Sequence, residues 1–221
     1  MEKVLVVSPH MDDETLGVGG SILKHLAKGD EVQVCFLCHR KYGNKFDPAR
    51  NQEEVDHVLR AKEVLGYHDV HFLNLEDERL DDALHKVIGP LEKVVQGYNP
   101  TIVYIPSFGD NNQDHRAAFE ACMVVFRPFA LEYKQLLAYE VLSSTDQSPP
   151  IAPFEFSPNY YVDITNELEK KQEAFSCYES ESFPWPHPRS LKAIEVLAQK
   201  RGLESNFHAA EAFMVIRQRW Y

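Results

Sequence analysis

One histidine and three acids stand within a span of five residues, soon after a short apolar run. Residues 8 to 16 read SPHMDDETL and come directly after VLVV. Carboxylates placed this close together repel one another unless a positive charge holds them. A divalent cation bound by imidazole and carboxylate offsets that repulsion. Taken alone, DDE after a strand is also typical of a helix N-cap with acids in its first turn.

A second polar loop follows a later apolar run. The segment TIVYIP is followed by SFGDNNQDHRAAF, which is rich in donor and acceptor side chains. In doubly wound sheets, ligands bind beyond the carboxyl ends of the strands, where the strand order reverses. If the first and fourth strands are neighbours, the two loops face each other. Folding then brings together five side chains: His10, Asp12, Asp13, Asp114 and His115.

This set of residues suits zinc. A catalytic zinc ion commonly takes three protein ligands, with a fourth position left for water. Two histidines and one carboxylate fulfil that count, and the spare carboxylates provide a base and partners for the ligands. Iron or cobalt could use the same ligands.

The elements that must position these loops alternate along the chain. Near-continuous apolar strands separated by helical periods predict an α/β fold, a Rossmann-like, mostly parallel sheet with helices on both faces. Gly29 and Gly66 stand where helices are expected to end. The expected strands are 3–8, 31–38, 70–73 and 101–106, and the expected helices are 14–28, 52–65, 82–96 and about 115–126.

The pattern loosens after residue 130. LLAYEVL, NYYVDI and FMVIRQR read as strands, VDITNELEKKQEAFSCY as a capped helix, and SLKAIEVLAQKRG as a helix with a glycine stop. SPPIAPF and FPWPHP are loops because of their prolines. We expect one domain over 1–221, with a Rossmann-like core at 1–130 and substrate-side elements at 131–221.

Bulk composition narrows the function classes. The net charge of −11 argues against a nucleic-acid or anionic membrane surface, which needs basic patches. No signal sequence or membrane span is recognisable, so we expect a cytoplasmic protein with reduced cysteines. Cys35 and Cys38 form a CxxC inside a strand, where they are expected to face opposite sides and serve as core thiols.

The motifs resemble those of a known family. PHMDDETLG is similar to the P/A-H-x-D-D-E signature of the PIG-L/LmbE-like de-N-acetylases, and NQDHRAAF is similar to their H-x-D-H motif except at its first position. PHPRSLKAIEVLAQKRG and AEAFMVIR resemble the C-terminal part of bacterial members. The resemblance therefore spans nearly the whole chain. It implies a zinc-dependent hydrolase that removes acetyl groups from N-acetylglucosamine moieties.

The resemblance also implies residue roles. His10, Asp13 and His115 would bind zinc, Asp12 would be the general base, and Asp114 would orient neighbouring groups. Asn112 stands where the family has a histidine that acts on the oxyanion or the leaving amine. An asparagine amide can donate a hydrogen bond to an oxyanion, but it cannot donate a proton at neutral pH.

The missing proton donor and the substrate contacts come from other segments. Either Asp12 returns the proton to the amine, or a histidine supplies it, and the candidates are His187 and His208. Arg50 is a candidate substrate contact in the segment before LG, and Trp185 could stack on a sugar or pack as a loop on the core. Arg189 and Glu211 could pair with each other or meet substrate hydroxyls. His39 and Arg40 could form the rim of the site.

A dinucleotide site is not expected at LGVGG, because Ile22 stands where the fingerprint needs glycine; the glycines permit close packing of the helix. The sequence thus predicts a zinc hydrolase acting on a small N-acetylated amino-sugar conjugate. The alternatives are an amidase for a larger N-acyl conjugate, and a metal-loaded sugar-binding protein with weak catalysis. A homo-oligomer is possible, since hexamers occur in the family.

Overall fold

One sheet organises the molecule. In the computed structural model, which describes residues 1–40, 47–152 and 154–220, seven strands pair in the order β3-β2-β1-β4-β5-β7-β6. The strands are β1 (Lys3–Ser8), β2 (Glu31–His39), β3 (Asp69–Glu76), β4 (Ile102–Pro106), β5 (Gln135–Tyr139), β6 (Tyr160–Asp163) and β7 (Ala210–Gln218). Strands β1 to β5 pair in parallel, and β7 runs antiparallel to β5 and β6. The predicted α/β class is confirmed.

The strand order reverses between β1 and β4. These two strands are parallel neighbours, with Val4 opposite Ile102 and Val6 opposite Tyr104. Because β1 and β4 are parallel neighbours, the loops that follow them leave the sheet side by side, and β2 lies on the other side of β1. The arrangement confirms the adjacency on which the predicted site depends.

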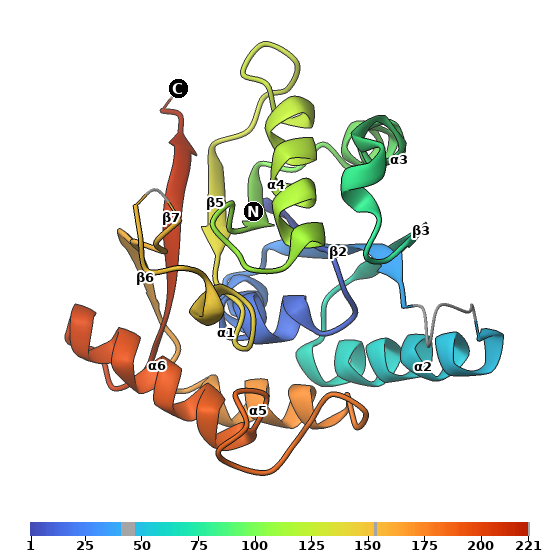
Figure 1. Ribbon diagram of the computed structural model, residues 1–221. Coiled ribbons are helices and arrows are strands. Elements are labelled where there is room, and N and C mark those ends of the chain that lie inside the picture. The colour runs from blue at the N-terminus through green and yellow to red at the C-terminus, as the bar shows by residue number, and fades with distance from the viewer. Residues whose placement is uncertain (41–46, 153, 221) are drawn as a thin grey trace.

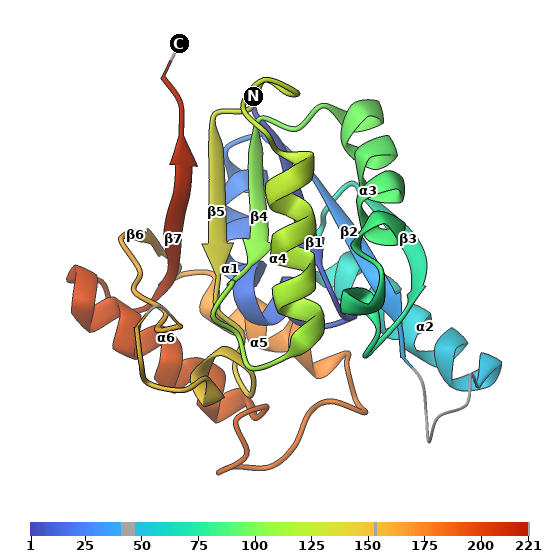
Figure 2. The same ribbon diagram turned by 45° about the horizontal axis from the view of Figure 1, so that its top comes forward.

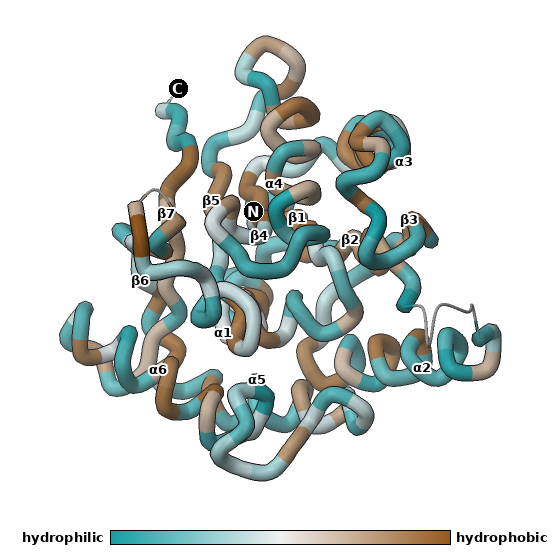
Figure 3. Tube along the Cα trace, viewed as in Figure 1, coloured by the Kyte–Doolittle hydropathy of each residue, from teal (hydrophilic) through white to brown (hydrophobic). Residues whose placement is uncertain are grey.

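Helices cover both faces of the sheet (Figures 1 and 2). One core cluster joins β1 to helices on one face, and a second joins it to two helices on the other. Figure 3 shows hydrophobic and hydrophilic residues alternating along the helices, and the buried apolar residues of these helices belong to the two clusters. The first face carries α1 (Asp13–Ala27), α2 (Pro48–Leu65), α5 (Leu168–Ser176) and α6 (Leu191–Ser205), and the second carries α3 (Leu84–Tyr98) and α4 (Gln113–Val125).

The glycines in α1 confirm close packing. A Cβ on Gly17 would collide with the Tyr139 ring, and one on Gly20 would lie 2.5 Å from Ile164. Only glycine allows this helix to approach β5 and the end of β6 so closely.

A buried ion pair between Lys171 and Glu211 binds the backbone of the same helix. The backbone N–H groups of Gly20 and Ser21 donate to Glu211 at 2.8 and 2.7 Å, and Lys171 donates to the Leu16 carbonyl at 2.7 Å. Lys171 also donates to Glu211 at 2.7 Å. The suggested pairing of Glu211 with Arg189 is therefore wrong, because Glu211 serves the backbone of α1.

Helix ends follow their expected signals with two exceptions. One of them is the start of α5: the helix begins after Glu167, whose side chain makes no capping hydrogen bond, so the cap expected in VDITNELEKKQEAFSCY is wrong. Gly66 ends α2 in the left-handed region at φ 85°, and Gly29 follows α1 at φ 81°. The expected stop at Gly202 is wrong, since α6 continues to a left-handed cap at Asn206. A Cβ on Gly202 would lie 2.6 Å from the Phe207 carbonyl oxygen, so this glycine permits a close return of the chain.

The second cysteine of CxxC is not placed as expected. The pairing of β2 with β3 shifts register between Phe36 and Cys38, where β3 holds one residue more than β2. Cys38 packs in the same core cluster as Cys35, at the end of the strand that leads to the site, so the expectation of opposite faces is wrong. Within the described ranges, no helix is long and apolar enough to cross a membrane.

Candidate metal centre

Three predicted ligands converge at the carboxyl ends of β1 and β4. His10 lies in the turn after β1, Asp13 begins α1, and His115 lies in the first turn of α4. The His10 Nδ1 atom lies 3.1 Å from His115 Nε2 and 3.4 Å from Asp13 Oδ2. The His115 Nε2 and Asp13 Oδ2 atoms are 3.2 Å apart. Ligand atoms of a tetrahedral zinc ion lie about 3.3 Å apart, so this donor set fits zinc.

Carboxylates orient both imidazoles. The Nε2 atom of His10 lies 3.2 Å from Asp114 Oδ2, and Nδ1 of His115 lies 3.1 Å from Asp110 Oδ2. The second contact has hydrogen-bond length, although its ring N–H is not well aligned. A carboxylate that accepts the far N–H leaves the near nitrogen free for a metal. Asp110 was not predicted, although it belongs to the polar loop that was singled out.

Both orienting carboxylates are anchored. Asp114 accepts hydrogen bonds from the backbone N–H of Glu78 at 2.6 Å and of Leu80 at 3.1 Å. Leu80 begins the short helix η1 (Leu80–Asp82). Burial alone would raise the pKa of Asp114, but the hydrogen bond from His10, the His10 charge and these N–H groups lower it. Asp114 therefore stays ionised and holds His10 to the segment after β3.

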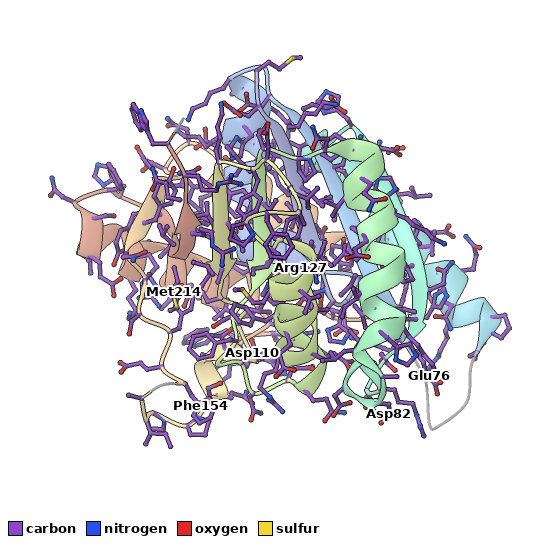
Figure 4. The ribbon with its side chains drawn as sticks, turned by 90° about the horizontal axis from the view of Figure 1, so that it is seen from above. Glu76, Asp82, Asp110, Arg127, Phe154 and Met214 are labelled. Atoms are coloured by element: carbon purple, nitrogen blue, oxygen red, sulfur yellow. The ribbon has the colours of Figure 1, made fainter. Side chains whose placement is uncertain are left out.

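Asp110 connects the site to the segment after β5. Its carboxylate accepts hydrogen bonds from Thr145 Oγ1 at 2.6 Å and from the Ser144 hydroxyl. Thr145 begins the short helix η2 (Thr145–Gln147). Against burial, the His115 charge and these hydrogen bonds lower the pKa of Asp110. Figure 4 shows Asp110 toward the same edge as Glu76 and Asp82, whereas Arg127 lies at the other end of α4.

The electrostatics of the centre favour positive charge. Burial lowers the pKa of His10, but contacts with Asp114 and Asp13 raise it to about 9. Burial likewise opposes charge on His115, but Asp13 and Asp110 raise its pKa to about 10. The pKa of Asp13 is held well below its ordinary value, against burial, by the two histidines. The surrounding carboxylates thus create the field that a divalent cation requires.

Asp12 lies beside the ligands with a different environment. Its carboxylate is fully buried and lies 2.8 Å from Nη1 of Arg189, yet neither oxygen has a well-aligned hydrogen bond among the described residues. Burial raises its pKa, Arg189 opposes the rise, and Asp13 adds to it. The backbone at Asp12 has φ 157° and ψ −20°, a rare combination for a residue other than glycine. Burial thus makes the Asp12 carboxylate easier to protonate than an ordinary aspartate.

Arg189 belongs to a chain of ion pairs at the rim. Its Nε donates to Ser143 Oγ at 2.8 Å, and its Nη1 contacts Glu181 as well as Asp12. Glu181 also pairs with Arg40, and Arg40 Nε lies 3.7 Å from Glu54. Arg40 was expected at the rim, whereas sequence reasoning did not include Glu54 or Glu181 in the site.

Asn112 is the N-cap of α4. Its Oδ1 accepts the backbone N–H of Asp114 at 2.8 Å, and its own N–H donates to Asp110 Oδ1 at 2.8 Å. The residue that replaces the expected histidine therefore starts the helix that carries His115.

The remaining predicted contacts lie in varied places. Arg50 is exposed in the first turn of α2. Trp185 is 59% exposed, so its ring is not packed on the core. His187 accepts the Arg189 backbone N–H at 3.0 Å and packs on Phe183, with ring centroids 4.4 Å apart.

His208 lies away from the ligands. It is exposed, and it interacts electrostatically with Asp163, which also interacts with Lys24. Lys24 lies in the last turn of α1, and Asp13 begins that helix. Eleven residues of helix separate them by about 16 Å, so His208 faces the other end of α1.

Comparisons with known proteins agree with this geometry. The family model of GlcNAc-PI de-N-acetylase (PIG-L) matches residues 5–126. The diacetylchitobiose deacetylase of Thermococcus kodakarensis is 27% identical over 198 residues, which cover 83% of this chain and 71% of that protein. A probable N-acetyl-alpha-D-glucosaminyl L-malate deacetylase 2 of Bacillus anthracis is 27% identical over 195 residues, 80% of each chain.

A solved structure shares the fold. The conserved protein TT1542 of Thermus thermophilus superposes with a TM-score of 0.81 at 23% identity, over 100% of this chain and 97% of that one. The likeness covers the C-terminal strands and helices as well as the part that the family model matches.

Proposed function

This chain belongs to the PIG-L family, and from that membership we propose that it is a metal-dependent N-deacetylase of amino-sugar derivatives. The relatives named above are deacetylases, so hydrolase activity is supported. The observation that carries the metal dependence is the triangle of His10, Asp13 and His115, with the Asp12 carboxylate beside it. The substrates in the names of these two relatives lead us to propose an N-acetylglucosamine unit as the substrate class.

The metal would be held by Nδ1 of His10, Oδ2 of Asp13 and Nε2 of His115. Asp114 and Asp110 keep the two rings in the required tautomers. When bound, zinc supplies Lewis acidity toward water and the acetamide carbonyl. The rest of the chemistry depends on how this chain places proton acceptors and donors.

Asp12 is the proposed general base. It accepts a proton from the attacking water as the new C–O bond forms at the acetyl carbon. The C–N bond then breaks, and Asp12 returns the proton to the leaving nitrogen, so the products are acetate and a free amine. The raised pKa that burial gives Asp12 suits both steps.

Arg189 is a positioning residue in this proposal. Its guanidinium contacts Asp12, while Ser143 and Glu181 hold its other side. Asn112 is engaged as a helix cap, so we assign it to positioning His115 and not to proton transfer. Return of the proton by Asp12 removes the need for His187 or His208.

A weaker catalyst is the second candidate, and Asn112 favours it. If the histidine that Asn112 replaces is needed for turnover, the chain would be a metal-loaded sugar-binding protein. An amidase for a larger N-acyl conjugate would use the same ligands and differ only in the acyl group released.

The test separates metal binding from chemistry. The wild type, Asp12→Ala and Asp13→Ala are compared for bound zinc and for products from N-acetylglucosamine, diacetylchitobiose and simple conjugates. We expect one zinc per chain and acetate release in the wild type, zinc without turnover in Asp12→Ala, and loss of zinc in Asp13→Ala. Full activity of Asp12→Ala would overturn the mechanism. Zinc binding without any release would favour the binding protein, and release of a larger acid would favour the amidase.

A further inference from the structure

A second group of ligand atoms lies on the other side of the His10 ring. A ring nitrogen of His10, a carboxylate oxygen of Asp114 and the Sγ atom of Cys38 all lie within 4.8 Å of one another, and it is Nε2 of His10 that lies 3.2 Å from Asp114 Oδ2. The first triangle uses Nδ1 of the same ring, so His10 lies between two sets of donors. Only the second set contains sulfur.

The end of β2 places the thiol there. The pairing of β2 with β3 shifts register between Phe36 and Cys38, and the backbone N–H of Cys38 donates to the Pro9 carbonyl at 3.0 Å. This hydrogen bond ties Cys38 to the residue before His10. The thiol is therefore held at the ring by the backbone and does not depend on a flexible loop.

A small cavity gives access to this group. It has a volume of about 10 Å³, on the order of the room that one water molecule needs, and is lined by His10, Met11, Cys38, Arg40 and Glu54. Two of the five lining residues carry sulfur, a soft donor. Arg40 brings a positive charge, but its ion pairs with Glu181 and Glu54 offset that charge.

We propose that Cys38, His10 and Asp114 form a second metal site, which takes soft, thiophilic cations such as Cu⁺ and Cd²⁺. Thiolate and imidazole donors favour such ions, whereas the sulfur-free triangle of His10, Asp13 and His115 suits zinc. The thiol proton is released to the buffer when the cation binds. The Met11 thioether adds a further soft donor to the same cavity.

The two sites are antagonistic because they share one imidazole. A cation bound to Nε2 displaces the N–H that His10 donates to Asp114, and that hydrogen bond holds Nδ1 toward the first site. Soft cations therefore weaken zinc binding and inhibit the enzyme. The inhibition rests on the proposed function, whereas the binding of the soft cation does not.

Cadmium titration of the purified full chain tests the binding. Cadmium coordinated by a thiolate has a charge-transfer absorption in the ultraviolet, and cadmium in the sulfur-free triangle has none. We expect this absorption to saturate in the wild type and in Cys177→Ser, a control that removes the partly exposed cysteine of the described chain. We expect Cys38→Ser and Cys38→Ala to lack it. Absorption in both Cys38 variants that equals the wild-type absorption, or loss of the absorption in Cys177→Ser alone, would overturn the proposal.

Two further readouts keep the test decisive. Circular dichroism identifies a Cys38 variant that fails to fold. In that case the cadmium-113 NMR spectrum of the wild type decides whether the site exists, because a chemical shift typical of nitrogen and oxygen ligands alone would contradict it. With zinc-loaded enzyme, the cadmium concentration that halves acetate release should rise by at least about tenfold in Cys38→Ser. An unchanged concentration would refute the antagonism. Absence of turnover on all substrates would count against the proposed function only, since the absorption still reports the second site.

Discussion

Replacing Asp110 by asparagine tests how the metal ligands are held. The Oδ2 atom of Asp110 lies 3.1 Å from Nδ1 of His115, and its two oxygens also accept hydrogen bonds from Ser144 and Thr145. Asp110→Asn keeps the shape and one acceptor oxygen but removes the negative charge. The ring of His115 then loses the partner that fixes its tautomer, so its Nε2 atom becomes a poorer zinc ligand.

The expected magnitude follows from that role. Loss of a carboxylate that orients a metal-bound histidine typically weakens metal affinity by about 10- to 100-fold, which is about 1.4 to 2.7 kcal/mol. The same change should lower the pKa of His115 in the metal-free protein, because Asp110 helps to raise that pKa to about 10. Both effects act without contact between Asp110 and the ion.

Competition with a chromophoric chelator measures the zinc affinity, and NMR titration of the imidazole measures the pKa. Asp146→Asn is the matched control. Asp146 lies in η2 and accepts the Ser144 backbone N–H at 2.9 Å, so its carboxylate serves this turn and not an imidazole. Its pKa is raised by burial, so loss of its charge should be tolerated. Wild-type zinc affinity in Asp110→Asn, or equal weakening in both variants, would refute the reasoning.

Three other predictions address the base and the buried charges. Asp12→Asn should keep its zinc while kcat falls by about 10²- to 10⁴-fold, as acetate release and metal analysis would show. Burial raises the pKa of Glu14 from 4.5 to about 7, so its contribution to stability is full below pH 4.5 and is lost as the pH rises through 7. With the metal removed by a chelator, the free energy of unfolding of the wild type, measured in urea, should therefore fall by up to about 3 kcal/mol between pH 4.5 and pH 7. The free energy of unfolding of Glu14→Gln should not show this fall. Parallel pH profiles would contradict this. Lys171→Met should cost about 3 to 5 kcal/mol in the same assay, because it leaves Glu211 buried without its partner; a cost below about 1 kcal/mol would exclude that role.

The sequence was most informative where local and global signals agreed. Strand β1 has the predicted bounds, because VLVV is a continuous apolar run between polar residues. The meeting of His10 with His115, which are 105 residues apart, followed from the strand-order rule and not from any local pattern. Gly66 was recognised as a helix end because glycine commonly follows the last turn of a helix. Its φ of 85° in the structure is a value that glycine adopts readily.

The partners of the site were harder to predict. Asp110 and Glu181 act through contacts that depend on how loops from distant elements meet, and no pattern of residue spacing in the sequence predicts such contacts. Strict alternation places Cys38 on the opposite face from Cys35, yet both thiols belong to one buried cluster, because Cys38 lies near the end of β2, where the pairing with β3 is irregular.

Glu211 and Asn112 show two further limits. Glu211 was expected to pair with Arg189 or to meet substrate hydroxyls, but it binds backbone N–H groups inside a helix, where such groups ordinarily bond within the helix. Asn112 carried a clear N-cap signal, an asparagine before a helical run, and the family pattern drew attention to catalysis instead.

The most direct test of the central claim is acetate release from an N-acetylated amino sugar as zinc is returned to chelator-stripped protein. The proposed function predicts a rate near zero without metal, which rises with added zinc and reaches its plateau at one zinc per chain. Acetate release that is the same with and without metal would contradict the account.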